Sequence, residues 1–115
     1  MDLTPYIETA RRRRQQEQEQ LQQRRQQALR TAQAAAQLLR EKFGVSRVVV
    51  FGSGLDERAF HTESDIDLAV WDLPSECYLP AVAKLLALSD FAFDLVPVES
   101  ASPYLRAAIA QGRPR

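Results

Sequence analysis

The sequence predicts an α/β (α+β) domain, in which a small mixed sheet of three or four strands is flanked by helices and preceded by a long polar helix. Two observations support this. Three short apolar runs alternate with segments whose apolar residues have helical spacing. Residues 6–43 contain neither glycine nor proline and consist largely of good helix formers.

The long helix is expected to start at Thr4-Pro5, with Thr4 as the N-cap, and to end at Gly44. Residues 11–27 are almost wholly polar, so they have no face that could pack on a sheet. Further along, apolar residues recur at spacings of three and four: Leu29, Ala32, Ala35, Ala36, Leu39 and Phe43. The second half of this helix is therefore expected to cover the sheet.

After Gly44, strands and helices alternate. The predicted strands are apolar runs at residues 45–51, 65–71 and 91–98. The predicted helices cover residues 76–88, capped by Ser75, and 104–111, closed by Gly112, with a further short helix at 53–58. Pro80 is expected to delay the start of the first of these helices.

Polar residues interrupt the apolar runs at three points. Gly52-Ser53 follows the first strand, Asp65 and Asp67 open the second, and Asp94 stands alone in the third. Asp65 and Asp67 point to the same side because side chains alternate along a strand. Carboxylates suit Mg²⁺, and Gly-Ser after a strand suits a phosphate. Each half alone is common in proteins, but their combination predicts a site for a metal-bound nucleotide.

The segment from Val48 to Trp71 resembles the signature of the polymerase-beta-type nucleotidyltransferase superfamily, in which Gly-Ser is followed about ten residues later by Asp-x-Asp. The short chain is most similar to minimal nucleotidyltransferase (MNT) proteins, which are often antitoxins encoded beside HEPN-domain toxins. The resemblance covers about residues 30–112. It divides the chain into a Gln/Arg-rich helical extension, residues 1–28, and an MNT domain, residues 29–115.

The resemblance implies an enzyme that uses ATP and Mg²⁺, with two ions expected. Asp65, Asp67 and Asp94 would be catalytic and would hold the metal, and Gly52 and Ser53 would hold phosphates. The implied reaction places AMP on a tyrosine of a HEPN-type toxin, and the implied assembly is a hetero-oligomer. Where the family commonly has an arginine three residues after the serine, this chain has Asp56, so Arg58 is a candidate to replace it.

Two other functions remain open. The protein could neutralise its partner by masking it, with a vestigial catalytic site, and the loss of the family arginine at Asp56 favours this reading. Alternatively, it could modify a small molecule, as antibiotic-modifying relatives do, although a chain of 115 residues leaves little room for an acceptor pocket.

The composition predicts the cellular compartment. One cysteine, Cys77, excludes an internal disulfide framework and predicts a reducing compartment, and no apolar run is long enough to span a bilayer. We therefore expect a cytoplasmic protein with no membrane contact.

Charge is distributed unevenly. Residues 1–47 carry ten Lys/Arg and five Asp/Glu, and residues 48–115 carry the reverse. For the basic stretch 11–25, three readings compete: a solvated helix, a docking arm for a protein partner, and a nucleic-acid contact. The last is disfavoured because no aromatic residues interleave with the arginines.

Overall fold

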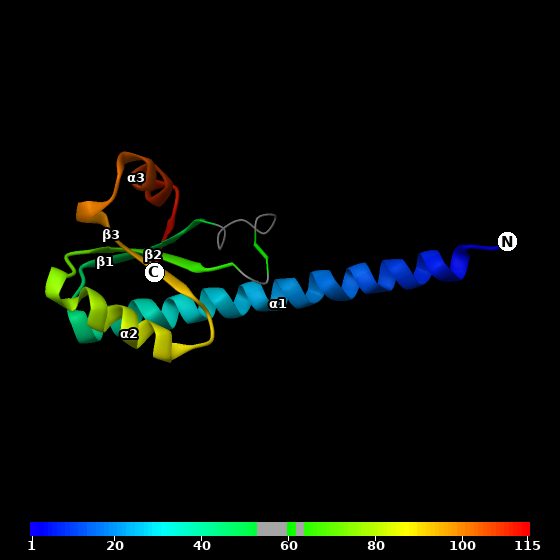
Figure 1. Cartoon of the computed structure of the whole chain (residues 1–115), viewed down its shortest axis with the longest axis horizontal. Coiled ribbons are helices and arrows are strands. Elements are labelled where there is room, and N and C mark those ends of the chain that lie inside the picture. The colour runs from blue at the N-terminus through cyan, green and yellow to red at the C-terminus, as the bar shows by residue number, and fades with distance from the viewer. Residues whose placement is uncertain (53–59, 62–63) are drawn as a thin grey trace.

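The computed structural model describes residues 1–52, 60–61 and 64–115. Figure 1 shows a sheet between two helical layers and one helix that extends far beyond it. The elements are α1 (Thr4–Phe43), β1 (Arg47–Phe51), β2 (Ile66–Trp71), η2 (Ser75–Cys77), α2 (Tyr78–Leu88), β3 (Phe93–Pro97), η3 (Val98–Ser100), α3 (Pro103–Ala110) and β4 (Arg113–Pro114). The predicted fold class is confirmed, and the sheet has four strands.

The sheet is mixed, with strand order β3-β2-β1-β4. β1 pairs antiparallel with β2 and with β4, whereas β2 and β3 run parallel. Alternate residues of the strands build two cores. Leu68 and Val70 lie on one face, packed with α1 and α2, and Val49 and Ala69 lie on the other, packed with Ile109 of α3. The strands are apolar on both faces because helices cover both.

Different interactions determine where α1 ends and where it begins. Gly44 ends the helix as predicted, with a φ of 68° that suits glycine, and its N–H donates to the carbonyl of Arg40. The predicted N-cap is wrong, because Thr4 already lies inside the helix. Its backbone N–H donates instead to the carboxylate of Asp2, at 2.9 Å.

The buried face of α1 begins where the sheet begins. Ala28, Ala32 and Leu39 are buried in the core, and Leu21 packs against its edge. Residues 1–20 are all exposed, which stretches the molecule to 67 × 29 × 18 Å. The polar composition of this part explains why it leaves the domain, since it has little apolar surface to bury.

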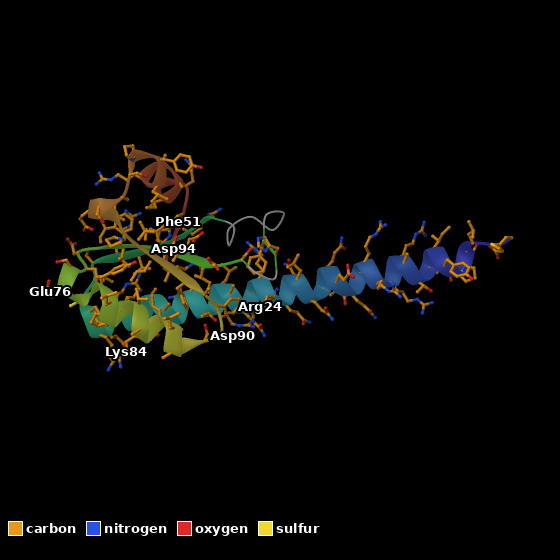
Figure 2. The ribbon with its side chains drawn as sticks, in the orientation of Figure 1. Arg24, Phe51, Glu76, Lys84, Asp90 and Asp94 are labelled. Carbon is orange, nitrogen blue, oxygen red and sulfur yellow. The ribbon has the colours of Figure 1, made fainter. Side chains whose placement is uncertain are left out.

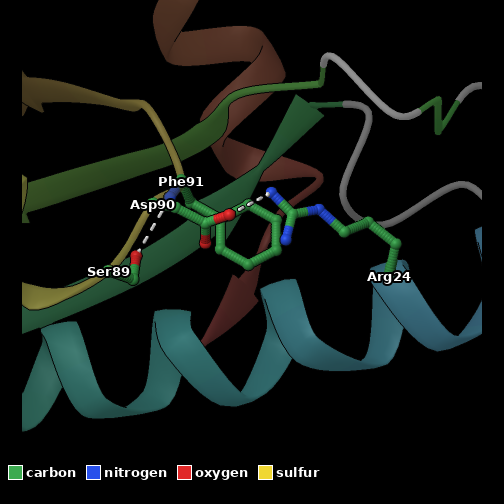
Figure 3. Close-up of polar contacts among 4 residues, drawn as sticks. All are labelled: Arg24, Ser89, Asp90 and Phe91. Atoms are coloured by element: carbon green, nitrogen blue, oxygen red, sulfur yellow. Dashed lines mark hydrogen bonds and ion pairs between the residues drawn. The ribbon is translucent and has the colours of Figure 1, made fainter.

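Arg24 fixes the point at which α1 leaves the domain (Figure 3). Its guanidinium lies 3.7 Å from the ring centroid of Phe91 and 3.2 Å from the carboxylate of Asp90. Ser89 supports the same turn, because its hydroxyl accepts a hydrogen bond from the N–H of Phe91 at 3.2 Å. These contacts tie the helix to the turn that leads into β3.

Two further expectations need correction. Helix α2 begins at Tyr78 after the 3-10 turn η2, not at Glu76, so Pro80 falls in its first turn, where a missing N–H is tolerated. Ser75 does not cap it. Gly112 closes α3 as predicted, because it follows the C-cap Gln111 and its N–H donates to the carbonyl of Ile109 at 2.9 Å. It has a second role: a Cβ there would lie 2.7 Å from the carbonyl oxygen of Val50, so glycine lets the chain approach β1 and form β4. The helix expected at residues 53–58 lies outside the described residues.

No helix in the described ranges combines the length and the apolar character needed to cross a membrane.

Candidate functional site

The site lies where β1 ends and where β2 and β3 begin. In the strand register, Asp67 of β2 stands opposite Phe51 of β1 and Asp94 of β3. Directly paired residues point to the same face, so Phe51, Asp67 and Asp94 form a row across the sheet on the side of α3. Figure 2 labels the two ends of this row, Phe51 and Asp94. Neighbouring strands are about 4.8 Å apart, which brings the two carboxylates of this row together.

The electrostatics of Asp67 are unfavourable in the isolated chain. The pKa of Asp67 is raised to about 6 from the ordinary value of 3.8. Partial burial is the largest cause, and the negative charges of Asp94 and then Asp65 add to it. Within the described residues, no side chain donates a hydrogen bond to Asp67 or Asp94. A carboxylate held this way is stabilised by an added positive charge.

Gly52 borders this row from the end of β1. Its φ is 75°, and a Cβ added to it would overlap the Oδ2 atom of Asp67. Glycine is thus required for two reasons, because only glycine adopts this backbone freely and leaves room for the carboxylate. Gly52 and Asp67, predicted as parts of one site, are in contact.

Of the other predicted site residues, the structure describes only Asp65. Asp65 is exposed and comes immediately before β2, close enough for its charge to act on Asp67. Ser53 and Arg58, predicted to bind phosphates, lie outside the described residues, as does Asp56.

Ser64 is a residue that the sequence reasoning did not single out. It is buried, its hydroxyl accepts a hydrogen bond from the N–H of His61 at 2.9 Å, and its own N–H donates to the carbonyl of His61 at 3.0 Å. These two bonds join His61 to Ser64, which directly precedes Asp65. Serine hydroxyls commonly accept hydrogen bonds from nearby backbone N–H groups, which is the signal that could have identified Ser64.

The residues present fit a hard cation such as Mg²⁺. All donors of the row are carboxylate oxygens, and the raised pKa of Asp67 reflects negative charge that a cation would offset. Nevertheless, among the described residues no three His, Cys, Asp or Glu side chains converge closely enough to enclose an ion by themselves. The arrangement is a carboxylate pair open to solvent at Asp94, to which a nucleotide phosphate could add oxygen ligands.

A carboxylate pair beside a glycine turn, on a four-stranded mixed sheet flanked by helices, is consistent with a nucleotidyltransferase fold. Comparison with solved structures shows which proteins the chain is similar to. The chain is similar to MNT antitoxins, as its motif predicts, and the similar structures described next are all toxin–antitoxin structures. No protein-family model matches the chain, and no curated relative does either.

The first similar structure is a mutant of an MntA toxin–antitoxin complex with two aspartate-to-glutamate substitutions two positions apart (27% identity, TM-score 0.61, 72% of this chain and 70% of that chain). Another is a toxin–antitoxin with AMP-PNP (31%, 0.57, 68% and 66%). A third is a tri-AMPylated Shewanella oneidensis HEPN toxin in complex with an MNT antitoxin (26%, 0.57, 76% and 70%). These matches confirm the resemblance to MNT antitoxins paired with HEPN toxins.

Proposed function

We propose that this protein is an antitoxin that transfers AMP from ATP to a tyrosine hydroxyl of a HEPN-type toxin, with which it forms a hetero-oligomer. The observation that carries the proposal is the register of Asp67 with Asp94, beside a glycine that leaves space for the Asp67 carboxylate. Structural aspartates are usually satisfied by hydrogen bonds or counter-charges. In the described residues, this pair has neither.

The roles follow from exposure and position. Asp94 is exposed, so an acceptor hydroxyl can reach it and give up its proton to the carboxylate. The hydroxyl oxygen then forms a bond to the α-phosphorus of ATP, and the bond to the bridging oxygen breaks to release pyrophosphate. Asp65, Asp67 and Asp94 would hold Mg²⁺, which supplies positive charge next to the triphosphate when bound. Gly52, Ser53 and Arg58 would contact the phosphates.

The similar structures support the nucleotide, the modification and the toxin partner of this proposal by analogy. One holds an ATP analogue, another an AMPylated HEPN toxin, and a third carries substitutions at two aspartates with the spacing of Asp65 and Asp67. The identities of 26–31% support the comparison of sites as well as of folds.

The test is to incubate the protein with ATP, Mg²⁺ and the toxin encoded beside it, and to weigh the toxin by mass spectrometry. The proposal predicts the added mass of one or more AMP groups, mapped by fragmentation to tyrosine. Omission of Mg²⁺ should prevent the addition.

A matched binding measurement distinguishes transfer from masking. Asp65→Ala with Asp67→Ala should stop the transfer while the protein still binds the toxin, because these side chains contact nucleotide and metal. A toxin of unchanged mass that is nevertheless bound and inhibited equally by both proteins would contradict the proposed transfer and leave a masking antitoxin.

A further inference from the structure

A cavity of about 260 Å³ lies between the sheet and α3, at the end of β2 that is farther from Asp67. Two arginines line it, Arg47 at the start of β1 and Arg106 in α3. Trp71, the last residue of β2, lines it as well. The other lining residues are apolar or glycine: Val98, Ile109, Ala110 and Gly112. We call this hollow the arginine cavity.

Both guanidinium groups of the arginine cavity are held by partners that do not neutralise their charge. The Cζ atom of Arg47 lies 4.7 Å from the ring centroid of Trp71, and a guanidinium stacked on an aromatic face keeps the N–H groups of its edge free. Arg106 donates from Nε to the carbonyl of Ala101 and from Nη2 to that of Glu99, each at 3.2 Å. These bonds use two of its five N–H groups. Neither arginine forms an ion pair with a carboxylate of the described residues.

The acidic residues nearest to the arginine cavity in sequence are directed elsewhere. Asp72 and Glu99 line a different cavity, where the Glu99 carboxylate accepts a hydrogen bond from the N–H of Asp72 at 2.7 Å. Asp67 lies four residues before Trp71 on β2, which is about 13 Å along the strand. A hollow with apolar walls and charges of one sign concentrates ions of the opposite sign. The arginine cavity therefore suits an anion, at a position separate from the carboxylate row.

We infer that the arginine cavity binds the phosphate group of a small molecule. One guanidinium fork satisfies the two oxygens of a planar carboxylate, whereas two forks that come from different elements suit the oxygens of a tetrahedral phosphate. A phosphate monoester carries nearly two negative charges, which matches two arginines. Pockets that enclose a whole ligand measure roughly 300–1,000 Å³, so this cavity encloses the phosphate group and leaves the rest of the molecule in solvent. The inference does not depend on the transfer reaction.

The fluorescence of Trp71 provides the test, because it is the one tryptophan of the chain and it lines the arginine cavity. The purified full chain is titrated with inorganic phosphate in the absence of Mg²⁺, with the ionic strength held constant by sodium chloride. The emission should change and saturate, because a phosphate bonded to Arg47 alters the charge over the indole ring. Acetate, titrated in the same way, should bind at least about tenfold more weakly.

A pair of matched variants assigns the binding to the arginine cavity. Arg106→Gln should weaken phosphate binding at least about tenfold, because it removes a charged hydrogen-bond donor. The control is Arg113→Gln, which removes the same charge from β4. Arg113 pairs with Val50, whose side chain belongs to the core on the other face of the sheet, so this variant should bind phosphate normally.

A second variant covers the case in which Arg106→Gln disturbs the turn before α3. Arg47→Gln leaves that turn intact and should weaken phosphate binding to a similar degree, measured by isothermal titration calorimetry because the contact with Trp71 is also lost. Circular dichroism checks that both variants are folded.

Four results would overturn the inference. One is a Trp71 emission that does not saturate with phosphate, and another is equal weakening in Arg106→Gln and Arg113→Gln, which would indicate only the effect of net charge. Acetate that binds as tightly as phosphate would indicate an acidic side chain of a partner protein. A single-stranded oligonucleotide that competes more strongly than phosphate would indicate a nucleic-acid surface.

Discussion

Carboxylates lie at both ends of β2, but they are hydrogen-bonded at one end and surrounded by negative charge at the other. At the far end, Asp72 accepts a hydrogen bond from the Ser46 hydroxyl at 2.5 Å, and its backbone N–H donates to Glu99 at 2.7 Å. At the near end, Asp67 lies beside two further negative charges and its pKa is raised. Satisfied carboxylates hold a turn in place, here one with a φ of 63° at Asp72, whereas unsatisfied ones indicate a ligand.

The largest cavity described here does not lie at the unsatisfied carboxylates but at the other end of β2. A cavity of about 770 Å³ lies at the satisfied end, where its lining includes Leu73, Pro74 and Tyr78 as well as Asp72 and Glu99. Its polar groups are already bonded within the protein; the Tyr78 hydroxyl, for example, donates to the carbonyl of Leu95 at 3.1 Å. We therefore place the proposed chemistry at the carboxylates that lack partners among the described residues, and not at the larger cavity.

The largest expected effect is on activity and compares the two ends directly. Asp67→Asn should lower AMP transfer at least about 100-fold, because a carboxylate that we propose binds the metal is lost. Asp72→Asn should leave the transfer rate unchanged, since asparagine tolerates a positive φ and can still accept the bond from Ser46. Rates are measured by radiolabelled AMP incorporation into the toxin. Equal losses in both variants would remove the distinction between the ends.

The next effect separates backbone strain from crowding of the carboxylate. Gly52→Ala and Gly44→Ala both place a side chain at a positive φ, and each should lower the free energy of unfolding by about 1–2 kcal/mol. Only at Gly52 does the new Cβ meet Asp67, because nothing lies within 4 Å at Gly44. Transfer should therefore fall at least about tenfold in Gly52→Ala alone. Urea unfolding and transfer assays on both variants check this, and an active Gly52→Ala would contradict the assigned contact.

The smallest effect is a pH dependence of stability. Asp67 has a pKa of about 6 in the folded chain and an ordinary value of 3.8. Since the folded pKa is the higher one, the stabilising contribution is complete below about pH 4 and is lost as the pH rises through about 6. For a half-buried, solvent-screened group we expect a loss of about 1–2 kcal/mol.

Asp67→Asn should remove this dependence and make the metal-free protein more stable at pH 7, whereas Asp72→Asn should retain it. Urea unfolding at a series of pH values measures both. Added Mg²⁺ should raise the melting temperature of the original protein at pH 7 and not that of Asp67→Asn. The same pH slope in Asp67→Asn as in the original protein would show that another group is responsible.

The sequence by itself determined the features that depend on local physics. Helical spacing and helix-forming residues predicted α1, and Gly44 marked its end, because these signals act within a few residues. Alternation along a strand placed Asp94 on the same face as Val96, and the Gly-Ser and Asp-x-Asp pattern predicted the resemblance to MNT antitoxins that the similar structures confirm. The N-cap at Thr4 was misjudged because Thr4 lies inside the helix and its N–H bonds to the carboxylate of Asp2.

Only the tertiary structure decided what depends on contacts between distant segments. The pairing of Asp67 with Asp94 requires a parallel register between strands that the whole of α2 separates. Two further contacts also join residues far apart in sequence. Gly52 lies against the carboxylate of Asp67, and the guanidinium of Arg24 lies over the ring of Phe91. Register and burial are set by how complete elements pack together, and a local pattern carries no information about the partner it will meet.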